Sequence, residues 1–169
     1  TELIVFMIFI GIGSNLKSET YGPPISNCEA AFEQISQNRV DILRQSSWYE
    51  TVPIPVSAQQ NFVNGVVAVK TNLDSLQLLD VLLAIEIEMG RQRSEPNAAR
   101  IIDLDLLSFN AKIIDSDRLT LPHPRLTERA FVVQPIAEIA PDWRHPISGL
   151  LITEILAGLT DQDIKLISA

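Results

Sequence analysis

With 169 residues, of which 46% are hydrophobic and 20% charged, the chain has the size and composition of one globular domain with a substantial core. Its formal net charge of −8 and pI near 4.7 argue against a nucleic-acid-binding surface, which normally carries a basic excess. Any phosphate site must therefore be a local cluster of positive charge.

The chain begins with an apolar run from Leu3 to Ile10. This run is too short to cross a bilayer, and Glu2 stands where a signal peptide carries a basic flank, so we predict a central strand and no membrane segment. The single cysteine, Cys28, has no partner for an internal disulfide. It favours a cytoplasmic location, and we expect it to be a small core residue.

The first half of the chain alternates strand and helix patterns. A strand from Leu3 to Gly11 is followed by a helix from about Asn27 to Gln37, and then by strands at Val40 to Glu50 and Phe62 to Thr71. The turn after the first strand lacks the third glycine of a dinucleotide-binding loop, because Leu16 follows Asn15. A Rossmann-type fold is therefore not predicted.

The second half begins with the clearest helix, from Ser75 to Met89. Asp74 is placed to cap it, Gly90 to end it, and Leu76, Leu79, Leu83 and Ile87 form an apolar stripe that we expect to face the core. After a polar loop from Gln92 to Ala99, the remaining predicted elements are strands at Ile101 to Phe109 and Lys112 to Ile114 and helices at Phe131 to Ile139 and Leu150 to Leu156. This order predicts an α+β sandwich of the split-βαβ type within a single domain, residues 1–169, with an antiparallel sheet and helices packed on one face.

Asp103 and Asp105 are the most informative residues. They alternate with Ile102, Leu104 and Leu106 along a strand, so both carboxylates share one face while the apolar side chains point to the core. Two adjacent carboxylates stay ionised when a divalent cation neutralises them, and Mg²⁺ suits this pair because it binds one or two carboxylates together with water and phosphate oxygens. The alternative is a solvated strand face whose charges only block edge pairing.

Arginines surround this pair. Of the 13 Lys and Arg residues, six are arginines in one stretch: Arg91, Arg93, Arg100, Arg118, Arg125 and Arg129. Guanidinium groups bind phosphate oxygens bidentately and screen charge during phosphoryl transfer, so the cluster favours a phosphate ligand next to the carboxylates. Helix-end arginines and surface ion pairs remain the alternative for each one singly.

Other side chains suggest the rest of a site. Glu86 precedes Arg91 on the predicted helix and would bond a ribose or support a metal ligand, and His123 sits between two prolines where its imidazole would donate to a phosphate. Phe62, Asn64 and Phe131 are suited to sandwich a flat heterocycle and read its edge. Surface solvation, an incidental loop histidine and core phenylalanines are the competing interpretations.

Several motifs occur in order along nearly the whole chain: Gly13-Ser14-Asn15-Leu16, Trp48-Tyr49-Glu50-Thr51, Phe62-Val63-Asn64, Glu86 with Gly90-Arg91-Gln92-Arg93, Arg100-Ile101-Ile102-Asp103-Leu104-Asp105-Leu106-Leu107, Leu121-Pro122-His123-Pro124-Arg125, and Arg129-Ala130-Phe131. Together they resemble the 6-hydroxymethyl-7,8-dihydropterin pyrophosphokinase family. The resemblance implies a ferredoxin-like fold and transfer of the pyrophosphoryl group of ATP to the pterin hydroxymethyl oxygen, with release of AMP, in folate biosynthesis.

The resemblance also implies roles for single residues. Asp103 and Asp105 would hold two Mg²⁺ ions. A strong general base is not required if a bound metal lowers the pKa of the attacking hydroxyl, and our own hypothesis is that Asp103 takes its proton. The residues implied to contact ATP or the transferred group are Arg91, Arg93, Arg100, His123 and Arg129, with Arg118 and Glu86 nearer the nucleoside. The pterin would be held by Thr51, Val52 and Ile54 through backbone groups, by Asn64 through hydrogen bonds, and by Phe62 and Phe131 through stacking. Arg91, Arg100, Asp103, Asp105 and His123 form the implied catalytic set.

One segment departs from the family pattern. The loop from Gln92 to Ala99 is about one residue shorter and lacks the tryptophan that family members often carry, so we predict that its ordering depends on nucleotide. Two other functions stay open: a ferredoxin-like module that binds nucleotide or pterin without chemistry, and a magnesium-dependent nucleotidyltransferase that releases pyrophosphate. Because one chain supplies every implied site residue, we expect a monomer whose partners are ATP and a reduced pterin.

Overall fold

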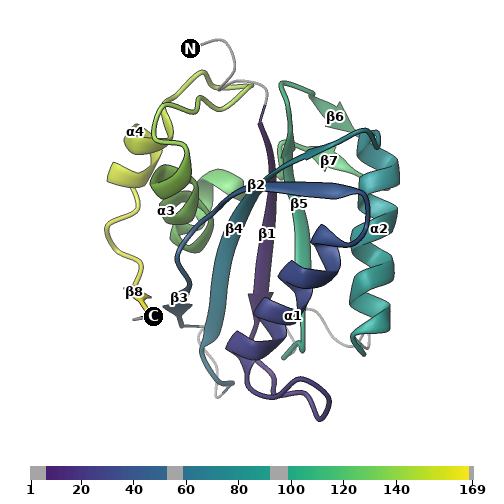
Figure 1. Ribbon diagram of the computed structural model, residues 1–169. Coiled ribbons are helices and arrows are strands. Elements are labelled where there is room, and N and C mark those ends of the chain that lie inside the picture. Colours follow the sequence, from purple (N-terminus) through teal and green to yellow (C-terminus); the bar gives the residue numbers. More distant parts are fainter. Residues whose placement is uncertain (1–6, 53–58, 92–98, 168–169) are drawn as a thin grey trace.

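The computed structural model describes residues 7–52, 59–91 and 99–167, and an antiparallel sheet forms its centre (Figure 1). Its strands are β1 (Ile8–Ser14), β2 (Val40–Gln45), β3 (Tyr49–Thr51), β4 (Phe62–Thr71), β5 (Asp103–Phe109) and β8 (Ile164–Leu166). They lie in the order β5-β1-β4-β3-β8, with β2 also paired to β4, and a separate ladder joins β6 (Ile114–Asp115) to β7 (Thr120–Leu121). This arrangement is the predicted ferredoxin-like split-βαβ fold.

Helices cover both faces of the sheet, so the expectation of one covered face is wrong. α1 (Pro24–Ser36) and α2 (Ser75–Glu88) lie on one side, and α3 (Ala130–Ile139) and α4 (Ile152–Ala157) on the other (Figure 1). The reason is visible in β1. Ile8 and Ile10 belong to a hydrophobic core beside α1 and α2, the first core, whereas Phe9 points the opposite way and belongs to a second core beside α3 and α4. Apolar residues on both faces require a helical layer on each.

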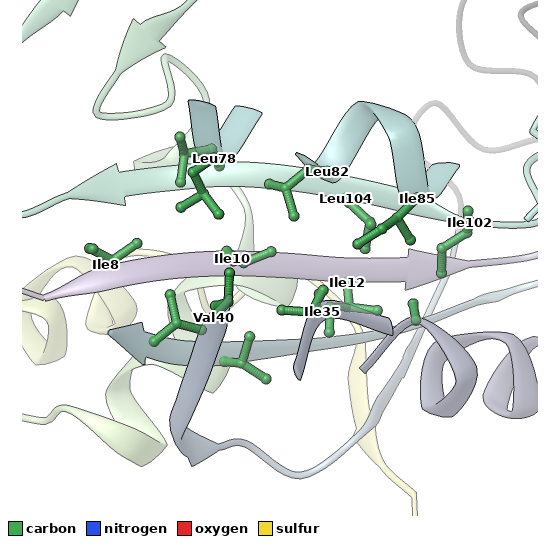
Figure 2. Close-up of a cluster of buried hydrophobic side chains, with 14 of the residues drawn as sticks. Ile8, Ile10, Ile12, Ile35, Val40, Leu78, Leu82, Ile85, Ile102 and Leu104 are labelled. Carbon is green, nitrogen blue, oxygen red and sulfur yellow. The ribbon is translucent and has the colours of Figure 1, made fainter. Parts of the chain in front are cut away.

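The first core fills the space between the sheet and the helices α1 and α2. Figure 2 shows Ile8, Ile10 and Ile12 along β1, facing Leu78, Leu82 and Ile85 of α2, with Ile35 of α1 beside them. Cys28 of α1 belongs to this core and is fully buried, as predicted. This packing fixes α2 against β5, and therefore sets where the end of α2 meets the two aspartates.

Two details of α2 test the sequence interpretation. The capping prediction is confirmed, because the Asp74 carboxylate accepts a hydrogen bond from the backbone N–H of Gln77, and Gly90 ends the helix with a φ of +93°. The predicted apolar stripe is wrong at Leu76 and Ile87, whereas its member Leu79 does pack against the core. Leu78, Leu82 and Ile85 form the buried face, whereas Leu76 is 44% and Ile87 74% exposed.

Several boundaries also differ from prediction. The predicted strand from Val40 to Glu50 divides into β2 and β3, because the ladder with β4 stops after Gln45, where Ser46 Oγ accepts a hydrogen bond from the Val66 N–H. α1 begins at Pro24, earlier than expected, since proline fits the first turn of a helix. The short strand expected at Lys112 lies at β6, and β7 and β8 were not anticipated.

Candidate functional site

Asp103 and Asp105 open β5 and lie opposite glycines of β1. Asp103 pairs with Gly13 and Asp105 with Gly11, so no side chain on β1 stands between the carboxylates and the space in front of the sheet. Both aspartates are partly exposed, while Ile102, Leu104 and Leu106 are buried. The predicted orientation of this strand is confirmed.

Two arginines hold the Asp103 carboxylate. Arg91 Nη1 lies 3.1 Å from Asp103 Oδ1, and Arg100 Nη1 lies 3.1 Å from Asp103 Oδ2. Each carboxylate oxygen therefore has one charged donor, which fixes the carboxylate plane. The arginines come from the end of α2 and from the residues before β5, so the site forms where these elements meet.

Glu86 is buried next to Arg91 and holds that arginine in place. It is 3% exposed, forms an ion pair with Arg91, and accepts a hydrogen bond from the Leu104 N–H at 2.8 Å. Burial raises the pKa of Glu86, while the Leu104 N–H and Arg91 act in the opposite direction. Glu86 thus joins α2 to β5 and orients the arginine that contacts Asp103.

The electrostatics of the aspartate pair favour a cation. Burial, and then the nearby Asp103 carboxylate, raise the pKa of Asp105 above its ordinary value of 3.8, with Arg129 and Arg100 opposing the shift. An ionised Asp105 is therefore costly in the protein alone. A divalent cation between the carboxylates would remove that cost.

The pair lies between two cavities of different chemistry. The first is lined by charged and polar side chains, with Leu79 and Leu83 on one wall; the predicted residues on it are Glu86, Arg91, Arg100, Asp103, Asp105, Arg118 and His123. The second is lined by Thr51, Val52, Phe62, Asn64, Phe131, Arg125 and Arg129, together with Arg100, Asp103 and Asp105. Arg100 and the two aspartates belong to both cavities, so the carboxylates form their common wall.

His123 has a defined orientation in the first cavity. Its backbone N–H donates to the Leu107 carbonyl at 2.8 Å, which ties its loop to β5, and its Nδ1 accepts from the Arg125 N–H at 3.1 Å. Neutral imidazole therefore carries its proton on Nε2. Burial and the Arg129 charge lower the pKa of His123, which favours this neutral donor form.

The outer arginines occupy different places. Arg118 lines the first cavity and pairs with Asp80 of α2. Arg129 lines the second cavity, beyond the aspartates, with its guanidinium 5.4 Å from the centre of the Phe131 ring. The structure therefore brings Arg129 to the aromatic side of the site.

The second cavity has the walls predicted for a flat heterocycle. Asn64 Nδ2 donates to Thr51 Oγ1 at 2.9 Å, and both residues are buried. A Cβ on Gly13 would lie 2.6 Å from Asn64 Oδ1, so glycine there makes room for the amide. Phe62 and Phe131 are partly exposed on the walls of this cavity. Ile54, Arg93 and the loop residues 92–98 lie outside the described residues.

Sequence reasoning gave no role to Asn15, which the structure places at a junction of the site. Asn15 Oδ1 accepts from the Arg100 N–H at 2.8 Å, and the Arg100 carbonyl accepts from the Asn15 and Leu16 N–H groups, each at 3.0 Å. Asn15 Nδ2 donates to Gln59 Oε1 and to the Gln60 carbonyl. Its place in the Gly13-Ser14-Asn15-Leu16 motif was the signal that pointed to it.

Comparisons with known proteins agree with this site. A family model described as 7,8-dihydro-6-hydroxymethylpterin-pyrophosphokinase (HPPK) matches residues 9–141. The chain is 39% identical over 158 residues to the Pseudomonas aeruginosa 2-amino-4-hydroxy-6-hydroxymethyldihydropteridine pyrophosphokinase, covering 94% of each protein. It is also 39% identical over 158 residues to the folic acid synthesis protein fol1 of Pneumocystis carinii, of which it spans 21%.

A solved structure shows the same fold. The wild-type Plasmodium falciparum HPPK-DHPS aligns with a TM-score of 0.67 at 16% identity, over 94% of this chain and 46% of that one. The chain thus spans less than half of these longer proteins and nearly all of the Pseudomonas relative. No helix within the described residues has the length and apolar content needed to cross a bilayer. By the family match and the identity to its full-length relative, this chain belongs to the 7,8-dihydro-6-hydroxymethylpterin-pyrophosphokinase family.

Proposed function

We propose that this chain transfers the pyrophosphoryl group of ATP to the hydroxymethyl oxygen of 6-hydroxymethyl-7,8-dihydropterin and releases AMP, in folate biosynthesis. The family match supports this reaction class. The observation that carries the proposal to particular residues is the common wall formed by Arg100, Asp103 and Asp105 between a charged and an aromatic cavity. A group transferred between a triphosphate and a pterin must pass this wall.

Magnesium is the proposed metal, bound at Asp103 and Asp105 as two ions. Within residues 7–52, 59–91 and 99–167, no group of three or more His, Cys, Asp or Glu side chains is placed to hold a metal by itself. Two carboxylates therefore need additional ligands, and phosphate oxygens and water complete the shell that Mg²⁺ prefers. When bound, Mg²⁺ would screen phosphate charge and lower the pKa of the attacking hydroxyl.

The first cavity is proposed to bind ATP. Arg91, Arg100 and His123 Nε2 would bind oxygens of the transferred group, and Arg118 would lie toward the nucleoside end, where Leu79 and Leu83 offer an apolar wall. Glu86 acts through Arg91 and the Leu104 N–H. Arg129 lines the second cavity, so we propose that it contacts the transferred group from the side where the pterin binds.

The second cavity is proposed to bind the pterin. Phe62 and Phe131 would stack on the ring, Asn64 would hydrogen-bond its edge while Thr51 orients the amide, and Val52 would close the wall. This orientation directs the hydroxymethyl group toward Asp103 and Asp105, which line the same cavity.

The chemical step follows from this placement. The hydroxymethyl oxygen attacks the β-phosphorus in line and forms a new P–O bond, while the bond from the β-phosphorus to the α,β-bridging oxygen breaks and that oxygen leaves with AMP. Asp103 takes the hydroxyl proton, and Arg91 and Arg100 screen the charge on the transferred group. Because one chain lines both cavities, we propose that residues 1–169 act as a single, monomeric pyrophosphokinase domain.

A steady-state assay tests this function. Purified protein is incubated with ATP, the hydroxymethyl dihydropterin and Mg²⁺, and AMP is quantified over time. We expect AMP to form only when both substrates are present, to stop with EDTA, and to resume with excess Mg²⁺. Binding of either substrate without AMP would instead indicate a binding module.

A further inference from the structure

The C-terminal residues 160–167, which lie beyond the residues 9–141 matched by the family model, contact two segments that line the second cavity. β8 pairs antiparallel with β3, with Ile164 opposite Thr51 and Lys165 opposite Glu50 (Figure 1). The Ile167 N–H donates to the Trp48 carbonyl at 3.0 Å. Since Thr51 lines the second cavity, this segment pairs with the strand that carries one of the cavity's lining residues.

Through Gln162, the same segment also contacts the backbone next to Arg129, another residue of the cavity lining. Gln162 Oε1 accepts from the Ala130 N–H at 2.8 Å, and Gln162 Nε2 donates to the Glu128 carbonyl at 2.7 Å. Both polar atoms of one side chain therefore grip the backbone on either side of Arg129. These two hydrogen bonds join Gln162 to residues that lie 32 and 34 positions earlier in the sequence.

This contact replaces a missing helix cap. Arg129 occupies the N-cap position of α3 with extended backbone angles, and its side chain makes no capping hydrogen bond. The first N–H groups of a helix need an acceptor from outside it. Gln162 supplies that acceptor for Ala130, so the beginning of α3 depends on the C-terminal segment.

The residues that flank this cap are functional candidates. Arg129 precedes Ala130 and Phe131 follows it, and both side chains line the second cavity, 5.4 Å apart from guanidinium to ring centre. Rotation of the backbone at Arg129 would move the guanidinium and the ring together. The bidentate contact from Gln162 opposes such rotation.

We propose that Gln162 is a positioning residue for pterin binding: by capping α3 and holding the Glu128 carbonyl, it sets Arg129 and Phe131 against the wall formed by Thr51. This inference rests on the proposed function of the second cavity. Gln162 acts through these residues and touches no reacting atom.

The test compares Gln162→Ala and Gln162→Glu with wild type and with Gln37→Ala, which makes the same change at an exposed position at the end of α1. For Gln162→Ala we expect kcat/KM for the pterin to fall about tenfold, the loss expected from removing one or two hydrogen bonds, with KM for ATP changed less than about twofold. Gln162→Glu keeps the acceptor for Ala130, so its loss should be smaller. Gln37→Ala should match wild type.

Amide hydrogen exchange gives a readout independent of activity. The Ala130 N–H should exchange faster in Gln162→Ala and remain protected in Gln162→Glu. If Gln162→Ala fails to fold, Gln162→Glu carries the kinetic test alone. A lower melting temperature with an unchanged pterin KM in the variants would show a merely structural role and overturn the inference. Absence of AMP formation by wild type would instead refute the proposed function.

Discussion

At the residue scale, the site depends on how Asp103 and Asp105 are held rather than on their presence alone. Two arginines fix the Asp103 carboxylate, and Glu86 fixes one of these arginines. Asp105, in contrast, carries the unfavourable charge of the pair because burial and Asp103 raise its pKa. The two aspartates should therefore respond differently to substitution.

Asp103→Asn tests the proposed proton acceptor and metal ligand. Asparagine keeps the shape but removes the negative charge, so we expect the rate of AMP formation at saturating Mg²⁺ to fall by about 10²- to 10⁴-fold. Asp41→Asn, a matched change at an exposed carboxylate on β2, should leave the rate unchanged. Near-normal turnover by Asp103→Asn would exclude the assigned role.

Asp105→Asn tests the electrostatic cost in the metal-free protein. A carboxyl whose pKa is higher in the folded than in the unfolded state binds its proton more tightly when folded, so stability falls as pH rises from 3.8 toward the raised value. Asparagine does not titrate. In EDTA, the melting temperature of Asp105→Asn should exceed that of wild type increasingly from pH 4 to about pH 7, the raised pKa of Asp105, and the difference should level off above it. A difference that does not vary with pH would contradict this.

At the element scale, the limits of sequence reasoning appear most clearly in α2. Its leucines and isoleucines occur on more than one side, so the 3.6-residue period permits two apolar stripes, and only packing against β1 and β5 selects Leu78, Leu82 and Ile85. The break between β2 and β3 was likewise missed. It depends on a tertiary contact, in which Ser46 Oγ accepts from the Val66 N–H at 2.9 Å.

A pair of truncations in α2 tests which face is buried. Leu82 is fully buried, so Leu82→Ala should lower the free energy of unfolding by about 2–5 kcal/mol. Ile87 is 74% exposed, and Ile87→Ala should change it by less than about 0.5 kcal/mol. Urea unfolding curves measure both values. Equal losses of unfolding free energy in the two variants would contradict the assignment of Leu82 to the buried face and Ile87 to the exposed face.

Asn15 joins elements that the sequence pattern treats as independent. Asn15→Ala removes the acceptor for the Arg100 N–H and the donor to the Gln60 carbonyl, so we expect a loss of about 1–3 kcal/mol in the free energy of unfolding. It should also lower kcat/KM for ATP, because Arg100 contacts Asp103. Asn72→Ala, at an exposed position, is the matched control for urea unfolding and kinetics. A stability equal to that of the control would contradict the role given to Asn15.

At the scale of the whole molecule, the order of the longer strands and helices was predictable because each carries its own pattern of apolar residues, whereas the short strands β7 and β8 and the division between β2 and β3 were not. The assembly of the site was predictable only through the family resemblance, since spacing along the chain does not show that Phe62 and Phe131 line one cavity. Gln162 is an example of a residue whose role could not be predicted from the sequence. Its role requires the C-terminal segment to return to α3, and no local pattern predicts that return.

The central claim is that a pyrophosphoryl group passes from ATP in the first cavity to the pterin in the second, next to Asp103 and Asp105. The most direct measurement incubates the protein with ATP, the hydroxymethyl dihydropterin and Mg²⁺, and identifies the products by ³¹P NMR and chromatography. We predict AMP and a pterin diphosphate in equal amounts. ADP with a pterin monophosphate, or pyrophosphate with an adenylylated pterin, would contradict attack at the β-phosphorus.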